Sequence, residues 1–198
     1  MITISNQTAR NFLVNYQNLN GNGNLKGSAG VTEYMNKVRC IQYDPLNVVG
    51  RNADLVLQSR VKNYKPEVLF DLLYKERSLY DAADKMIGII PTADYPAMAR
   101  IRQKTVEQLH DILIWRKSLA ALDYLYHSGV PGISSKNKTH KVYDFSERLF
   151  PGEILNAADP FKNEHDFAKW YLKRRIGAVG LVWNKNGGTW LGLQIPIS

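Results

Sequence analysis

Gln42 and Asp44 are the residues of this chain whose types and spacing could do hydrolytic chemistry. They lie in the run Ile41-Gln42-Tyr43-Asp44-Pro45. In a short strand, the period-two alternation of side chains would place Gln42 and Asp44 on one face and Tyr43 on the other. Pro45 has no N–H for a ladder, so the strand would end there. An amide and a carboxylate on one rigid support could hold a water or a sugar carbon between them.

The same spacing also fits a purely structural interpretation. Asp44 could cap the turn that begins at Pro45, and Gln42 could be an ordinary surface residue. No other chemistry competes with this site, because Cys40 and the four histidines (His110, His127, His140 and His165) show no metal-ligand spacing. The chain also has no glycine-rich phosphate loop. We therefore expect neither a metal nor a cofactor.

The first half of the chain alternates helical patterns with short apolar runs. We predict helices from Ser5, over 31–39 and over 66–76, where Pro66 lies in the first turn. Strands are expected over 41–44, 79–82 and 86–90. Helix, helix, short strand, helix and hairpin describe a winged-helix unit.

The second half repeats this theme. We predict helices over 94–113 and 116–127 and a hairpin over 130–143 with a basic tip at 134–141. A further helix begins at Asn163, and Asn186-Gly187 marks a last hairpin. The fold class is therefore α+β, with mostly helical tandem winged-helix units and short β-hairpin wings. The expected domains are 1–92 (the first unit, with the Gln-Tyr-Asp motif), 93–152 (an abbreviated second unit) and 153–198 (a third unit).

Charge and cysteine content indicate which kind of partner and which cellular compartment to expect. The net charge is +8, and residues 100–198 carry 15 basic and 9 acidic side chains against 11 and 9 in residues 1–99. A basic protein favours a polyanionic partner such as nucleic acid. Cys40 is the only cysteine, so we interpret it as a small buried side chain in a reducing compartment. No run is long and apolar enough for a membrane helix, and no signal peptide is expected.

Two longer phrases resemble the winged-helix DNA glycosylases of the AlkZ/YcaQ type, which excise alkylated bases and unhook DNA crosslinks. The run from Ile41 to Arg60 is similar to that family's Gln-apolar-Asp catalytic strand and the helix after it. The run from Val142 to Pro151 is similar to the segment that leaves its second winged helix, and Thr8 to Leu13 fits weakly. The chain departs from the family at Tyr80–Lys85, where the usual histidine is missing. It also ends soon after the third hairpin, where family members continue into a β-rich part.

The resemblance implies a glycosylase site at the motif. Asp44 would stabilise positive charge on the sugar and align or deprotonate the attacking water, and Gln42 would hold that water or a sugar oxygen. An alkylated base is already cationic, so no strong general acid is needed. We predict a monofunctional enzyme because no lysine nucleophile is obvious beside the motif, although Lys37 is near in sequence. The expected enzyme is a cytoplasmic, nucleoid-associated monomer that acts on duplex DNA.

The side chains expected to contact DNA lie beside the motif, in the first wing, on the second hairpin and on the last helix. They are Arg39, Asn47, Arg51, Lys85, Lys136, Lys138, Lys141, Lys173, Arg174 and Arg175. Arg51 could instead pair with Asp54 or Glu33, and the hairpin and helix cations could be solvated surface. Two other functions also stay open, a non-catalytic winged-helix regulator that binds DNA and a protein-interaction module.

Overall fold

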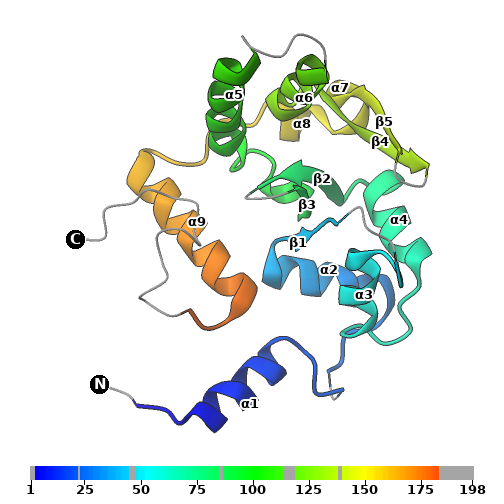
Figure 1. Cartoon of the computed structure of the whole chain (residues 1–198), viewed down its shortest axis with the longest axis vertical. Coiled ribbons are helices and arrows are strands. Elements are labelled where there is room, and N and C mark those ends of the chain that lie inside the picture. Colours follow the sequence, from blue (N-terminus) through cyan, green and yellow to red (C-terminus); the bar gives the residue numbers. More distant parts are fainter. Residues whose placement is uncertain are drawn as a thin grey trace.

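The chain has the α+β class expected from its sequence, with helices gathered around small antiparallel sheets (Figure 1). The structure is a computed structural model that describes residues 3–21, 23–44, 48–84, 87–113, 119–137 and 140–182, without the side chains of residues 110–113, 119 and 120. The last predicted hairpin lies outside the described residues from 183 onward. The division into three units is not tested by this structure and stays a prediction.

The part of the chain predicted as the first winged-helix unit contains α2 (Gly27–Val38). Its buried side chains recur at helical spacing, at Val31, Tyr34, Met35 and Val38. The helix ends at Arg39, which has a left-handed backbone (φ 61°) and turns the chain into β1 (Ile41–Gln42). Two more helices follow, α3 (Asn52–Gln58) and α4 (Pro66–Tyr74). Helix α3 was expected only from the family resemblance, which places a helix after the motif strand.

The sheet of this unit has the strand order β1-β3-β2. Strand β2 (Leu79–Ala83) forms an antiparallel pair with β3 (Ile87–Pro91), and β3 also pairs with β1 through Ile41–Ile89 and Gln42–Gly88. Helix, strand, two helices and two strands follow one another in this order, which is typical of a winged helix; the unit predicted over 1–92 stays a prediction. The motif therefore lies on an edge strand of this sheet.

The middle of the chain packs on the face of the sheet opposite to α2, α3 and α4. After the 3-10 turn η1 (Thr92–Asp94) come α5 (Ala99–Leu113), α6 (Leu119–Ser128) and the hairpin of β4 (Pro131–Asn137) and β5 (His140–Phe145). The basic tip predicted at 134–141 is wrong in extent, because pairing continues to Asn137–His140. Its polar side chains lie along two strands, and short helices α7 (Ser146–Leu149) and α8 (Gly152–Leu155) follow.

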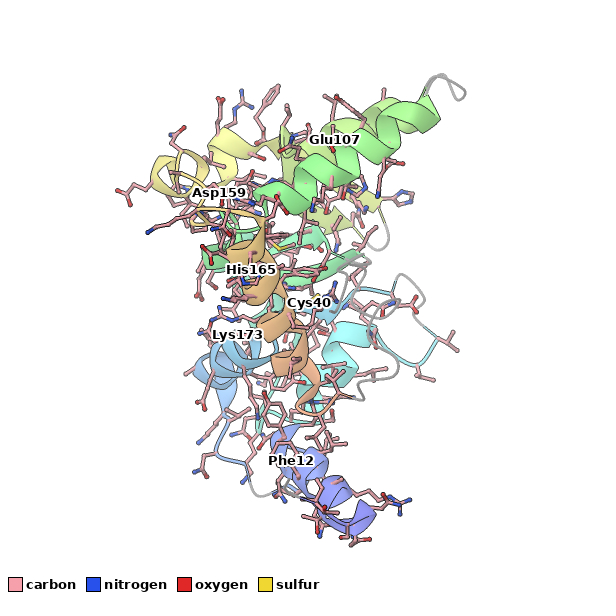
Figure 2. All side chains as sticks on the ribbon, turned by 90° about the vertical axis from the view of Figure 1, so that its left-hand side faces the viewer. Phe12, Cys40, Glu107, Asp159, His165 and Lys173 are labelled. Carbon is pink, nitrogen blue, oxygen red and sulfur yellow. The ribbon has the colours of Figure 1, made fainter. Side chains whose placement is uncertain are left out.

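Two further helices, α9 (Glu164–Val179) and α1 (Asn6–Tyr16), lie near the two ends of the described chain. Helix α9 starts at Asn163 as predicted, because the Asn163 side chain accepts from the Asp166 N–H at 2.9 Å, and it packs along α2. Helix α1, which carries Phe12, lies at the end of the molecule opposite α5, which carries Glu107 (Figure 2). Tyr16 donates to the Gly177 carbonyl oxygen at 2.7 Å, so α1 meets the end of α9.

The two faces of the first sheet bury two hydrophobic cores. One face packs on α2, α3 and α4 through residues such as Met35, Leu57 and Ile89. The other packs on the start of α5 and on α7 through Tyr80, Met98 and Phe150. The sheet is therefore held between the N-terminal helices and the second half of the chain.

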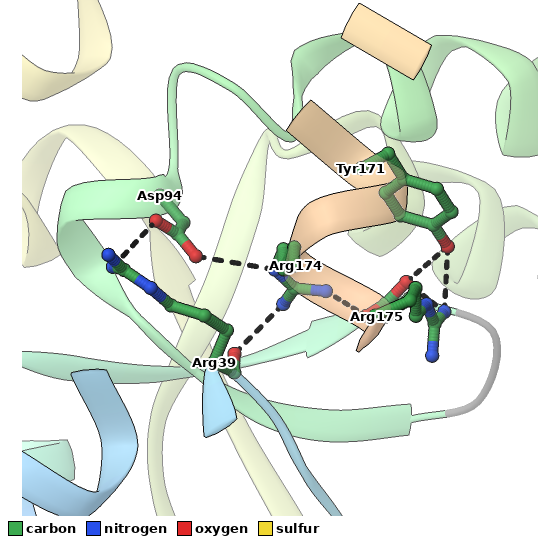
Figure 3. Close-up of polar contacts among 6 residues, drawn as sticks. Arg39, Asp94, Tyr171, Arg174 and Arg175 are labelled. Carbon is green, nitrogen blue, oxygen red and sulfur yellow. Dashed lines mark hydrogen bonds and ion pairs between the residues drawn. The ribbon is translucent and has the colours of Figure 1, made fainter. Parts of the chain in front are cut away.

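A buried ion network joins α9 to the sheet (Figure 3). The Arg174 side chain is 2% exposed and forms ion pairs with Asp84 Oδ2 (2.5 Å) and Asp94 Oδ2 (3.3 Å). It also donates to the Arg39 carbonyl oxygen at 2.9 Å. Arg175 pairs with the other oxygen of Asp84 (2.5 Å). These contacts place the end of α2, the end of β2 and η1 against one guanidinium.

We expect Arg174→Ala to destabilise the protein by about 3–5 kcal/mol, because Asp84 and Asp94 would be left with less compensation in a buried site. Urea unfolding followed by circular dichroism measures this change. The matched control is Lys173→Ala on the exposed face of the same helix, which should change stability by less than about 0.5 kcal/mol. Equal effects of the two substitutions would contradict the structural role of the network.

Candidate functional site

Strand β1 presents Gln42 to solvent, and its pairing with β3 extends by one more residue, to Tyr43. Gln42 is exposed, and Asp44 is partly exposed. The Tyr43 N–H donates to the Ile87 carbonyl oxygen at 2.9 Å, and Asn52 Nδ2 donates to the Gln42 carbonyl oxygen at 2.8 Å. The backbone of the motif is thus fixed from β3 on one side and from α3 on the other.

The register of the sheet assigns the motif side chains to its two faces. Gln42 lies opposite Gly88, which lies opposite Ala82, and residues opposite each other in antiparallel pairs project to the same face. Gln42 therefore shares the face of Ala82 and Tyr80, while Tyr43 shares the face of Ile41, Ile89 and Asp81. This agrees with the alternation predicted for Gln42 and Tyr43.

Tyr43 lies against a buried ion pair that comes from two distant elements. Lys136 of β4 contacts the carboxylate of Asp81 on β2, and its Nζ lies 3.5 Å from the centroid of the Tyr43 ring. Tyr74 donates to the same carboxylate at 3.1 Å. Burial, and after it the charge of Asp81, raises the pKa of Tyr43. The second hairpin thus reaches the central residue of the motif.

Lys136 therefore does not lie on an exposed wing tip, as its predicted DNA contact would need. Its side chain is 9% exposed, against 1% for its partner Asp81. Burial lowers the pKa of Lys136, and the Asp81 carboxylate opposes that shift. Sequence reasoning missed this contact because the two partners lie 55 positions apart.

Arg51 pairs with Asp54, one of the two acidic partners considered for it. Its Nε lies 2.5 Å from Asp54 Oδ2, and Tyr64 donates to Asp54 Oδ1 at 2.5 Å. The charges of Arg51 and Asp54 both act on the Tyr43 hydroxyl. This second cluster therefore borders the motif on the side of α3, and the Arg51 side chain, 42% exposed, still reaches solvent.

The other predicted DNA contacts are dispersed. The Arg39 side chain is 39% exposed and pairs with Asp94 at 3.3 Å. Lys173 is exposed on α9, Lys141 Nζ lies 5.0 Å from the Tyr126 ring centroid, and Arg175 pairs with Asp84. Arg174 is occupied by the protein's own carboxylates. Asn47, Lys85 and Lys138 lie outside the described residues.

Cys40 lies just before the motif, on the face of Gln42. Burial raises the pKa of its thiol to about 11, with a further contribution from the charge of Asp84. This agrees with its interpretation as a small buried side chain rather than a nucleophile. In the part of the chain that the structure describes, no three His, Cys, Asp or Glu side chains group as a metal site, and no helix is long and apolar enough to cross a membrane.

Comparison with known families identifies the segment that carries this site. Residues 35–123, just under half of the chain, match the family model described as DNA glycosylase AlkZ-like. This segment is AlkZ-like. It contains the motif, the whole first sheet and α5, so the resemblance seen around Ile41–Arg60 is confirmed.

The match does not reach the other two phrases. Thr8–Leu13 and Val142–Pro151 lie outside residues 35–123, so their likeness to the family stays a prediction. No curated protein and no solved structure matches the chain. Lys136 on β4 contacts Tyr43 of the motif, and Arg174 on α9 contacts the Arg39 carbonyl oxygen before it; both also lie outside the matched residues.

We expect Cys40 to resist alkylation in the folded protein. With a thiol pKa of about 11, only about one thiol in a thousand is ionised at pH 8, against roughly one in four at an unperturbed pKa of 8.5. Iodoacetamide labelling at pH 8, followed by intact-mass spectrometry, should be at least about 100-fold slower than in 8 M urea. Equal rates in the two conditions would contradict the burial of the thiol.

Proposed function

We propose that this protein hydrolyses the N-glycosidic bond of alkylated or crosslinked bases in duplex DNA. One observation carries the proposal: the AlkZ-like match spans β1 and the residues just after it, where Gln42 is exposed and Asp44 is partly exposed. The backbone of that strand is fixed by β3 and Asn52. A fixed support suits a site that must hold its polar groups against a sugar and a water.

The proposed chemistry needs one carboxylate and one amide. As the base leaves, positive charge develops on the sugar, and the Asp44 carboxylate stabilises this charge electrostatically. The same carboxylate accepts a proton from the attacking water, which Gln42 orients through its amide. No acid is assigned to the leaving base, so the favoured substrates are bases that alkylation has already made cationic.

Lys136, a lysine that contacts the motif, is a poor nucleophile for a bifunctional mechanism. Lys136 is paired with Asp81 and lies on the Tyr43 face of the sheet, opposite to the face of Gln42. A Schiff base requires an uncharged amine that reaches the sugar. We therefore keep the monofunctional assignment within this proposal.

The composition of α4 favours an enzyme over a regulator that reads DNA through a recognition helix. In helix-turn-helix proteins the second helix of the motif enters the major groove. Helix α4 contains Glu67 and Asp71 and no lysine or arginine, and Phe70 is 39% exposed on it. An acidic helix is repelled by phosphates, so we assign DNA contacts to Lys141, Lys173, Arg39 and Arg51, together with Asn47, Lys85 and Lys138.

Asp44→Asn should reduce base excision by about 10²–10⁴-fold, because it removes the carboxylate that acts on the water and on the sugar charge. The measurement is single-turnover release of 7-methylguanine from alkylated duplex DNA. Glu153→Gln, an exposed carboxylate on α8, is the matched control and should excise at the wild-type rate. Wild-type excision by Asp44→Asn would overturn the catalytic assignment, and a wild type that binds duplex DNA but excises nothing would favour the regulator.

Binding to duplex DNA should weaken steeply with salt, by about 10²-fold or more between 50 and 200 mM KCl if several cations neutralise phosphates. Fluorescence anisotropy with a labelled duplex measures the slope. Lys173→Gln should lower this slope by about one unit. A flat salt response would instead support the protein-interaction module.

Lys136→Met should slow excision by about tenfold or more and leave the dissociation constant for DNA unchanged. Lys136 touches Tyr43 but is too buried for a phosphate, so it acts as a positioning residue. Lys136→Arg keeps the charge beside Asp81 and should restore part of the rate. Lys141, the partner of Lys136 across the hairpin, is the matched control: Lys141→Met should weaken DNA binding at an unchanged rate. The reverse pattern would contradict the positioning role.

A further inference from the structure

A cavity lies between β2 and the second half of the chain, and Asp81, the partner of Lys136, belongs to its lining. Its walls come from β2, the start of α5, the end of α6 and β4. Three of its aromatic side chains pack on one another, with ring centroids 5.5 Å apart for Tyr80 and Tyr95, 5.7 Å for Tyr80 and Phe150, and 5.3 Å for Tyr95 and Phe150. An aromatic wall of this kind suits a flat ring.

Two buried polar atoms that line this cavity have no hydrogen-bond partner. They are Tyr80 Oη and His127 Nδ1, two of only four such side-chain atoms among the described residues. Tyr80 is 7% exposed. An unpaired buried polar group costs about 1–3 kcal/mol, so two of them at one cavity indicate groups that a ligand satisfies.

A third polar group completes the edge of the cavity. The Arg102 guanidinium lies 3.9 Å from the Tyr95 ring centroid and donates from Nη1 to the Tyr95 carbonyl oxygen at 2.9 Å, which leaves Nε and Nη2 for a ligand. The Asp81 carboxylate is taken by Lys136 and Tyr74. Burial lowers the pKa of His127, which favours the neutral imidazole with one donor and one acceptor. The matching ligand is planar, uncharged or anionic, and carries several ring acceptors.

We propose that this cavity binds a free purine base, stacked on the aromatic wall and hydrogen-bonded to Tyr80, His127 and Arg102. The inference rests on the proposed function, because a free base is the product of glycosidic hydrolysis. The sheet supports the link, since Ala82 lines the cavity and lies in the same cross-strand row, and on the same face, as Gln42. The cavity is thus a product site on the catalytic face of the sheet.

The test measures binding of adenine and 3-methyladenine to the full chain by saturation-transfer NMR and isothermal titration. We expect both bases to bind the wild type below millimolar concentration. Tyr80→Phe should weaken binding by about five- to tenfold through the loss of one hydrogen bond. It should leave the melting temperature of the free protein unchanged or higher, because the hydroxyl has no partner to lose. Tyr143→Phe, on β5 outside the cavity lining, is the control and should bind as the wild type does.

Three outcomes overturn the base site, and they are distinct from the outcome that tests the glycosylase. If neither base binds at millimolar concentration, or if Tyr80→Phe binds as tightly as wild type, the cavity is not a base site. A clear fall in melting temperature for unliganded Tyr80→Phe would show that a buried water already satisfies the hydroxyl. Excision of 7-methylguanine is measured separately, so excision without base binding refutes only the product site. Base binding without excision refutes only the glycosylase.

Discussion

The arrangement of the site depends on the buried guanidinium of Arg174. It touches the Arg39 carbonyl oxygen just before the motif strand, Asp84 just after β2 and Asp94 in the turn after β3. Charges with 1–9% of their side chains exposed must be paired to be tolerated. The relative position of these three segments is therefore held by a helix that begins more than 120 residues after Arg39.

A second buried cation acts on the opposite face of the same sheet. Lys136 comes from the hairpin and meets Asp81 and the Tyr43 ring, while Arg174 comes from α9 and meets the ends of the strands. Both cations lie in the half of the chain with the larger basic excess, and both are used internally. The AlkZ-like segment contains the motif, but α9 and β4, which hold its strand, come later in the chain.

Local signals predicted the parts of the fold that local chemistry decides. The apolar spacing of Val31, Tyr34, Met35 and Val38 is enough for α2, and Asn163 is enough for the start of α9. Helix α3 is only seven residues long, so the apolar pattern did not indicate it and only the family resemblance implied a helix there. The burial of Lys136 and Arg174 could not be predicted from the sequence. A cation at an alternating strand position or on a polar helix is expected to face solvent, unless the distant carboxylate that pairs with it is known.

This internal use of charge limits what the DNA surface can do. Since Lys136, Arg174, Arg175 and Arg100 already pair with the protein's own carboxylates, the net charge overstates the cations left for phosphates. Fewer phosphate contacts mean weaker binding in general. A weakly held duplex would suit the proposed one-carboxylate site, which would discriminate by the reactivity of the bond rather than by affinity. In the proposed mechanism, intact bases leave too slowly to be cut during a brief encounter, whereas a cationic base leaves readily once Asp44 faces its sugar.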